Sequence, residues 1–274
     1  MKAARFEYMR AGDTNEALRL LEQNTGRARL IAGAQSLAPM LNLRLARPQL
    51  LIDIARIEAL RRIEDLGSKW RIGAAVTHAQ LEDGQLDGAG MLREVAGSIA
   101  YRAIRNRGTI GGSLAHADPA ADWPVALAAL GAIVNLRSSR GLRGVSAETF
   151  IIGAFTTALT DNEIIESVEV PKLSPAGRCA YCKFSRKTGD FAEASAAAVF
   201  DPRARTARLF LGALRSKPVA LANLANRVAA EGQDAATHEN VMAALAAACP
   251  ELDAIERRMA SGVIRRAVRE ALQS

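Results

Sequence analysis

The stretch 106-NRGTIGGSLAHADPAAD-122 holds the least ordinary combination of residues in the chain. Its three glycines permit a positive φ angle and a close approach of the backbone to a ligand. Consecutive free N–H groups in such a bend would form an anion-binding nest. The hydroxyls of Thr109 and Ser113 can donate to a phosphate oxygen. The spacing alone is equally consistent with a ligand cradle and with a turn that leads into a helix.

The end of this stretch predicts a helix start. Asp118 and Pro119 are typical of an N-cap and a first helical residue, and the apolar run that follows ends at Leu130. Asp122 would then lie one turn into the helix, where its carboxylate could accept hydrogen bonds from a polyol. Histidine and aspartate also ligate metals. Because Asp118 is better explained as a cap, too few ligands remain, so we expect no metal here and assign no role to His116.

A second glycine turn, 31-IAGAQSL-37, follows a predicted buried strand at 28–32. Gly33 lies where that strand must end, and Gln35 and Ser36 supply side-chain donors. This turn alone is weak evidence for a ligand. Two such turns, both edged with hydroxyl or amide groups, favour a ligand that carries two phosphates.

The common nucleotide fingerprints are absent from the sequence. It contains no GxxxxGKS or GxxxxGKT, which argues against a P-loop enzyme. The only near match to GxGxxG, 88-GAGMLR-93, ends in arginine and follows no predicted strand, so a Rossmann site is unsupported. No GxSxG nucleophile elbow occurs.

The composition is that of a folded chain, with 49% hydrophobic, 24% charged and 4% aromatic residues. Its 274 residues suffice for two domains. The net charge of +7 comes from scattered arginines, which argues against nucleic-acid binding. No apolar run approaches the roughly 20 residues that cross a bilayer, and we expect no transmembrane segment. Three cysteines, an odd number, fit a reducing compartment, and we expect a cytoplasmic protein.

The pair Cys179 and Cys182 forms a C-x-x-C. On a strand, residues three apart point to opposite faces, so we expect neither a metal site nor a redox pair.

The first half alternates predicted strands and helices. Asp13 and Glu16 resemble a capping box, and a second capped helix begins near Thr77, where we expect His78 to be a surface or capping residue rather than a base. The apolar spacing predicts a single helix over 91–105, and the glycines of 139–144 predict a turn. The expected elements are a helix at 14–24, strands at 28–32, 50–54, 69–74 and 132–138, and an exposed-face strand at 163–171 closed by Pro171.

Beyond a linker at 172–178 the pattern changes to strands followed by helices, which predicts a smaller α+β domain from about residue 176. Within it, 183-KFSRKTGDF-191 predicts a hairpin tip from which Asp190 could reach across a domain interface. The expected elements are an antiparallel meander at 179–186, 193–200 and 205–214, and helices near 218–230, 238–248 and 255–272.

These residues together resemble the FAD-binding medium subunit of heterotrimeric molybdenum hydroxylases, the family of xanthine dehydrogenase and aerobic carbon monoxide dehydrogenase. The resemblance covers nearly the whole chain. It is carried by 32-AGAQSLAPMLNLRLARP-48, 51-LIDI-54, 72-IGAAVTHAQL-81, 104-IRNRGTIGGSLAHADPAAD-122, 151-IIGAFTTAL-159 and 181-YCKFSRKTGDFA-192.

The resemblance implies an α+β fold with two domains. Residues 1–175 would form an FAD-binding domain of the vanillyl-alcohol oxidase and p-cresol methylhydroxylase type, with α+β subdomains at about 1–56 and 57–175. Residues 176–274 would form a C-terminal domain like that of the carbon monoxide dehydrogenase flavoprotein, with a three-stranded antiparallel sheet and helices.

The resemblance also implies the cofactor contacts. Asp122 is expected near the ribityl chain, and Ile165 near the isoalloxazine ring. Tyr181, Lys183 and Asp190 fall where the C-terminal domain would approach the flavin. The residues implied to hold the pyrophosphate are Ala32, Gly33, Ala34, Gln35, Ser36 and Leu37 in the first turn, and Thr109, Ile110, Gly111, Gly112 and Ser113 in the second.

The implied function is that of an electron-transferring oxidoreductase subunit. Electrons would pass from molybdenum in a large molybdopterin subunit, through two 2Fe–2S clusters in a small subunit, to FAD here and then to an external acceptor. The assembly would be a heterotrimer or a dimer of heterotrimers. No side chain of this chain is expected to act on the organic substrate. The alternative is a non-catalytic assembly or maturation protein that keeps the fold but binds FAD weakly or not at all.

One departure from the family pattern makes that alternative conceivable. The first turn usually reads Ala-Gly-Gly-x-Ser, whereas Ala34 here replaces the second glycine. If residue 34 needs a left-handed backbone, its Cβ costs roughly 1–2 kcal/mol.

Overall fold

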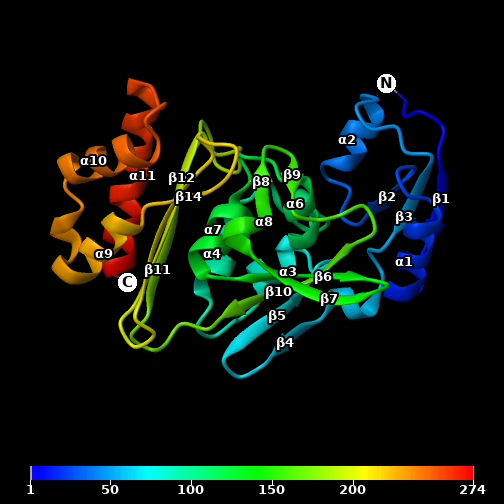
Figure 1. The fold of residues 1–274 in the computed structure, drawn as a ribbon, viewed down its shortest axis with the longest axis horizontal. Coiled ribbons are helices and arrows are strands. Elements are labelled where there is room, and N and C mark those ends of the chain that lie inside the picture. The colour runs from blue at the N-terminus through cyan, green and yellow to red at the C-terminus, as the bar shows by residue number, and fades with distance from the viewer. Residues whose placement is uncertain (1, 274) are drawn as a thin grey trace.

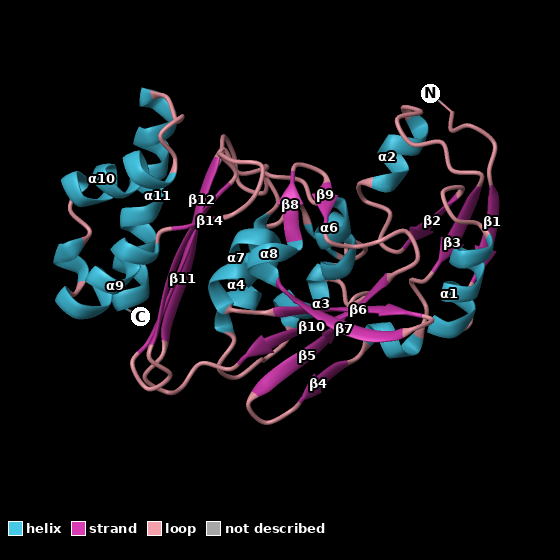
Figure 2. Cartoon of the chain, viewed as in Figure 1, coloured by secondary structure: helices cyan, strands magenta, loops and turns pink. Residues whose placement is uncertain are grey.

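The computed structural model describes residues 2–273, and Met1 and Ser274 lie outside the described part. The chain is an α+β structure built on three main sheets that follow one another along the molecule (Figures 1 and 2). A three-stranded sheet lies at the N-terminal end, a five-stranded sheet in the middle, and a four-stranded sheet with three helices at the C-terminal end.

The N-terminal sheet is parallel, in the order β1-β3-β2. The capping prediction at Asp13 is confirmed, because its side chain accepts a hydrogen bond of 2.8 Å from the Glu16 N–H. The predicted strands at 28–32 and 50–54 are also confirmed, whereas β1 was not expected because its residues are all exposed and show no apolar alternation. The elements are β1 (Glu7–Arg10), α1 (Thr14–Gln23), β2 (Ala28–Ile31), α2 (Leu37–Asn42) and β3 (Leu50–Asp53).

The middle sheet is antiparallel, in the order β4-β5-β10-β6-β7. Its strands are β4 (Ile63–Asp65), β5 (Lys69–Gly73), β6 (Ile133–Ser138), β7 (Gly141–Ser146) and β10 (Ile164–Pro171).

Two expectations for this sheet were wrong. The strand at 163–171 is not an exposed-face strand: β10 is the central strand, and Ile164, Val168 and Val170 are fully buried. The glycines of 139–144 do not form one turn. Only residues 139–140 turn, and β7 pairs with β6 from Gly141 onward. Glycine is tolerated there because β7 is an edge strand.

The helix predicted over 91–105 is broken in two. Ile99 is extended and Ala100 adopts φ 45°, so α4 (Gly90–Ser98) ends before α5 (Arg102–Arg105) begins. Arg105 stabilises the break by donating to the carbonyl oxygens of Ile99 and Ala100 at 3.0 and 2.9 Å. The other elements around the middle sheet are η1 (Glu58–Arg61), α3 (His78–Asp83), α6 (Ile110–His116), α7 (Asp122–Leu130), α8 (Ala147–Phe150), β8 (Ile151–Gly153) and β9 (Thr156–Thr157).

The C-terminal meander and helices are confirmed. One face of the sheet packs on α9 and α11, with α10 against these two helices, and the other face packs on α4 and α7 (Figure 1). Cys179 packs with the middle core and Cys182 with the C-terminal core, so the two side chains do lie on opposite faces. The elements are β11 (Arg178–Phe184), β12 (Ala194–Asp201), β13 (Thr206–Gly212), β14 (Val219–Ala220), α9 (Ala222–Glu231), η2 (Gln233–Ala235), α10 (His238–Ala248) and α11 (Ala254–Gln273).

Three buried apolar clusters correspond to the three sheets, and the middle cluster also takes in Tyr181, Ala197, Val199 and Phe210 from the C-terminal sheet. The division into domains near residue 176 stays a prediction. Among the described residues, no helix combines the length and the apolarity that a membrane span requires.

Candidate functional site

The first glycine turn joins β2 to α2. Ala34 adopts φ 62°, in the left-handed region, and Ser36 is right-handed helical with φ −98° and ψ −46°. Within residues 2–273, the backbone N–H groups of 34–37 have no acceptor. Successive N–H groups in alternating left- and right-handed conformations form a concave anion-binding nest. The first turn therefore combines consecutive free N–H groups with a left-handed residue, Ala34.

The second glycine turn differs from the expected nest. Thr109 is the N-cap of α6, and neither Gly111 nor Gly112 has a positive φ. The N–H groups are also occupied: Ile110 donates to the Val76 carbonyl oxygen at 3.1 Å and Gly111 to that of Ala74 at 3.0 Å. Gly112 donates to the Thr109 side chain at 3.1 Å. The prediction of free consecutive N–H groups here was wrong, because residues 74–76 pair with this segment.

These glycines serve close packing of backbone on backbone. A Cβ at Gly33 would overlap the Arg107 carbonyl oxygen and lie 2.9 Å from the Gly108 Cα. A Cβ at Gly111 would lie 2.5 Å from the Ala74 Cβ. The two turns, more than seventy residues apart in sequence, are therefore in direct contact through Gly33.

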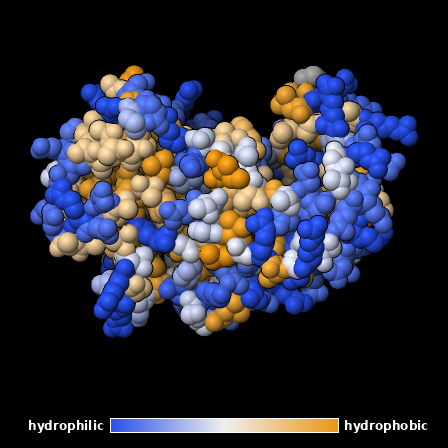
Figure 3. All heavy atoms as spheres, in the orientation of Figure 1, coloured by the Kyte–Doolittle hydropathy of each residue, from blue (hydrophilic) through white to orange (hydrophobic). Residues whose placement is uncertain are grey.

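The contact brings unpaired donors together. Ser36 is exposed and Ser113 half-buried, and within the described chain neither hydroxyl has a hydrogen-bond partner. In Figure 3 the upper outline of the molecule is hollowed between the lobe that carries α2 and the lobe that carries the C-terminal sheet. The free N–H groups of 34–37 and the two hydroxyls fit a pyrophosphate.

The predicted helix cap at Asp118 was wrong. Helix α7 begins at Asp122 with Ala121 as N-cap. Asp118 instead accepts a hydrogen bond of 2.9 Å from the Ala120 N–H, which forms a separate turn after Ala117 ends α6 with φ 51°. Aspartate caps such turns as readily as helices, so the local sequence did not distinguish the two.

Asp122, the first residue of α7, lies where this helix meets strand β11 of the C-terminal sheet. Its Oδ1 accepts from the Tyr181 hydroxyl at 2.6 Å and from Lys183 Nζ at 2.9 Å, and all three side chains are at most 10% exposed. Lys183 Nζ also donates to the Ser98 carbonyl oxygen at 3.0 Å. Burial and the Asp122 charge raise the pKa of Tyr181 well above its usual value, so its hydroxyl remains a donor. The structure thus brings three predicted site residues together.

Ile165 and Asp190 lie apart from this group. Ile165 is buried on β10 opposite Leu136, beside a bulge in the strand pairing. Asp190 lies at the β11–β12 hairpin tip, where its carboxylate accepts only from the Phe191 N–H. The hairpin tip does contact the segment between α4 and α5, but through Gly189. A Cβ at Gly189 would lie 2.6 Å from the Ala100 carbonyl oxygen.

His78 is a residue that the sequence reasoning misplaced. We expected a surface or capping residue, yet the side chain is only 5% exposed and its Nδ1 accepts from Trp123 Nε1 at 3.2 Å. Burial, and then the charge of Arg105, lowers the pKa of His78 to about 4. Its place after the Thr77 cap is equally common for exposed histidines, so no local signal marked it.

His116 stacks against Phe155, with the ring centroids 5.2 Å apart. Across residues 2–273 no cluster of three histidine, cysteine or acidic side chains could hold a metal ion.

Comparison with known proteins places these features in a family. The family described as the FAD binding domain in molybdopterin dehydrogenase matches residues 4–173. The alpha subunit of the 6-hydroxypseudooxynicotine dehydrogenase complex of Paenarthrobacter nicotinovorans is 42% identical over 201 residues, which cover 73% of this chain and 68% of that subunit. The carbon monoxide dehydrogenase medium chain of Hydrogenophaga pseudoflava is 40% identical over 247 residues, 89% of this chain and 86% of the relative.

The solved structures agree with these relatives. Reconstituted carbon monoxide dehydrogenase from Oligotropha carboxidovorans superposes with a TM-score of 0.91 at 30% identity, over 100% of this chain and 99% of the other. The expected α+β FAD-binding fold is therefore confirmed. The relatives are components of dehydrogenases, so the chain is an oxidoreductase subunit and its cofactor is FAD. The chain belongs to the family of FAD-binding subunits of molybdopterin dehydrogenases.

Proposed function

We propose that this chain holds the FAD pyrophosphate between the turn at 32–37 and the N-terminal end of α6, at 109–113. The observation that carries the proposal is the contact of Gly33 with Arg107 and Gly108, which sets the two turns side by side. The N–H groups of 34–37 would bind one phosphate as a nest. The hydroxyls of Ser36 and Ser113 would complete the anion site.

The flavin end would lie toward the C-terminal sheet. Asp122 Oδ1 is already taken by Tyr181 and Lys183, so only Oδ2 is left to accept from a ribityl hydroxyl. Ile165 would present an apolar surface to the ring, and Asp190 would approach from the hairpin tip. In this arrangement Lys183 positions Asp122 as well as contributing positive charge near the flavin.

We further propose that the chain transfers electrons within a complex. Bound FAD supplies the redox chemistry, and the protein holds it, tunes its potential and leaves one edge accessible. Electrons would come from 2Fe–2S clusters of a small partner subunit, which receives them from a large molybdopterin subunit, and would leave to an external acceptor. Relatives described as medium chains of carbon monoxide dehydrogenase support this placement.

A cytoplasmic location is part of the proposal. All three cysteines are unpaired, which is typical of proteins in a reducing compartment.

Flavin binding tests the proposal. The purified chain is freed of cofactor, titrated with FAD, and followed by flavin absorption and fluorescence. We expect one FAD per chain, and co-purification with an iron–sulfur subunit and a molybdopterin subunit when the neighbouring genes are co-expressed. A colourless protein that cannot be reconstituted with FAD would contradict the proposal and favour a non-catalytic assembly protein.

A further inference from the structure

Gly108 is held between His78 and Gly33. A Cβ at Gly108 would lie 2.8 Å from both Cδ2 and Nε2 of the His78 ring, so the ring edge touches the glycine backbone directly. On its other side, a Cβ at Gly33 would lie 2.9 Å from the Gly108 Cα. The order in space is therefore imidazole ring, second turn, first turn. The ring edge therefore limits how far the second turn can move away from the first.

The His78 backbone is tied to the same segment. Its N–H donates to the Gly108 carbonyl oxygen at 2.9 Å, and Thr77 forms a bridge with Thr109. Ile110 then donates to the Val76 carbonyl oxygen at 3.1 Å. These bonds fix the segment along its length. The His78 side chain adds a second contact with this segment, through its ring edge against Gly108.

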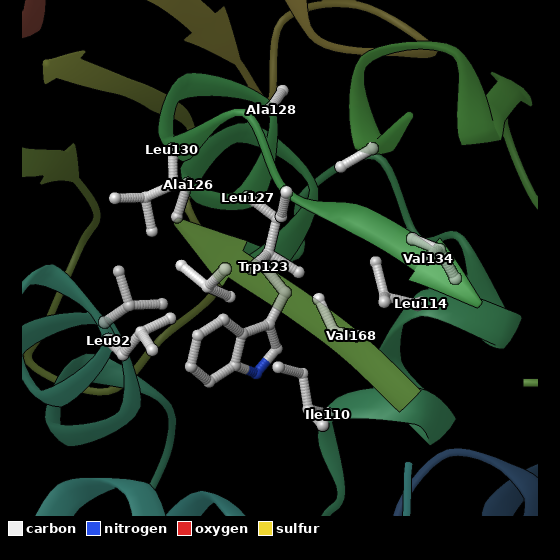
Figure 4. Close-up of a cluster of buried hydrophobic side chains, with 14 of the residues drawn as sticks. Leu92, Ile110, Leu114, Trp123, Ala126, Leu127, Ala128, Leu130, Val134 and Val168 are labelled. Atoms are coloured by element: carbon white, nitrogen blue, oxygen red, sulfur yellow. The ribbon is translucent and has the colours of Figure 1, made fainter. Parts of the chain in front are cut away.

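Trp123 fixes the orientation of that side chain. Its indole N–H can only donate, so the His78 Nδ1 that it contacts at 3.2 Å must carry a lone pair, and the ring proton is on Nε2. Trp123 is fully buried and is packed among Leu92, Ile110 and Val168 (Figure 4). The indole therefore holds the imidazole in one rotamer and one tautomer.

We infer that His78 is a positioning residue for the cofactor turns: its ring, oriented by Trp123, sets the spacing between Gly108 and Gly33. The inference rests on the proposed function, because spacing matters only if both turns hold one pyrophosphate. A residue that locks the geometry of a binding turn from behind governs affinity without touching the ligand. His78 is separated from the open side of the turns by Gly108 itself.

The test compares FAD with riboflavin, which has the same ring system but no pyrophosphate. Deflavinated full-length chain is titrated with each ligand by fluorescence, for wild type, His78→Ala and Trp123→Phe. Trp123→Phe removes the donor together with part of the buried ring, so its thermal midpoint is compared with that of the control. Leu130→Ala, in the same buried helix but away from Gly108, is the matched control for a general loss of stability. The thermal midpoint of each apoprotein is measured alongside.

We expect His78→Ala to raise the Kd for FAD about tenfold and Trp123→Phe about threefold, with riboflavin binding unchanged. Leu130→Ala should lower the thermal midpoint but leave both Kd values within about twofold of wild type. If the variants weakened the binding of FAD and of riboflavin equally, or left FAD binding unchanged, the inference would be overturned but the proposed function would stand. Wild-type chain that binds no FAD would overturn the proposed function as well.

Discussion

Lys183 and Asp122 form a buried ion pair that joins β11 to the first residue of α7, with Nζ 2.9 Å from Oδ1. Charges that are 10% and 7% exposed gain little from water, so each depends on the other. The pair ties the C-terminal sheet to the segment that follows the second cofactor turn.

Loss of the lysine should be costly. Lys183→Met leaves the Asp122 carboxylate buried with only Tyr181 as partner, and we expect a loss of about 3–5 kcal/mol in the free energy of unfolding. Denaturant unfolding of the apoprotein measures it. The matched control is Arg186→Met, in the loop that follows β11, because its ion pair with Glu193 is formed by an 85% exposed arginine. That change should alter stability by less than about 1 kcal/mol. Similar losses in the two variants would contradict the prediction.

The buried His78 should make stability fall with acidity. Its pKa is about 4 in the folded chain and 6.5 in the unfolded one, so between these values the unfolded state binds more protons. The contribution of His78 to the free energy of unfolding is complete above pH 6.5 and is lost as the pH falls toward 4. At 1.36 kcal/mol per pKa unit, the difference between the unfolded and folded pKa of His78 corresponds to about 3 kcal/mol of stability. The only charged side chain that shifts this pKa is Arg105, which is itself paired with Glu82.

Urea unfolding at a series of pH values between 4.5 and 6.5 checks this expectation. The carboxylate of Glu163, whose pKa is lowered from 4.5 to about 2 chiefly by Arg143, also begins to lose its contribution at the acid end of that window, but His78→Asn retains this contribution. His78→Asn should flatten the dependence. A wild-type slope no steeper than that of His78→Asn would show that the imidazole is not the titrating group.

Ala34→Gly should restore the usual family turn. Ala34 has φ 62°, and a left-handed alanine costs roughly 1–2 kcal/mol. Glycine removes this strain but loses more entropy on folding, so we expect a net gain of about 0.5–1 kcal/mol in stability. FAD should also bind more tightly. Ala213→Gly is the control, because Ala213 has φ 70° and is half-buried like Ala34 but lies after β13 in the C-terminal sheet. It should give a similar shift in thermal midpoint with no change in the Kd for FAD.

Gly33→Ala should separate the two turns. The added methyl would overlap the Arg107 carbonyl oxygen, which belongs to the backbone and has little freedom to move. We expect loss of FAD binding in a titration together with a lower thermal midpoint. Gly262→Ala, within α11 and with no atom within 4 Å of the new Cβ, should instead raise stability by about 0.5–1 kcal/mol and leave FAD binding intact. Wild-type FAD binding by Gly33→Ala would refute the proposed contact between the turns.

Much of the secondary structure could be predicted because its causes are local. The Asp13 cap, the meander at 179–214 and the opposite faces of Cys179 and Cys182 depend on hydrogen bonds and alternation within a few residues. The errors arose where a distant segment decides the outcome. β10 is central because β5 and β6 pair with both its edges. The N–H groups of 110 and 111 are occupied because residues 74–76 accept from them.

The sequence by itself determined that this chain has two small-residue turns suited to phosphate, and its motifs identified the family. Only the tertiary structure decided that Gly33 packs on Gly108, that Lys183 neutralises Asp122, and that His78 is buried beneath the second turn. The physical reason is distance along the chain. Glycine and hydroxyl patterns act over a few residues, whereas burial and ion pairing depend on which remote segments the folded core brings together.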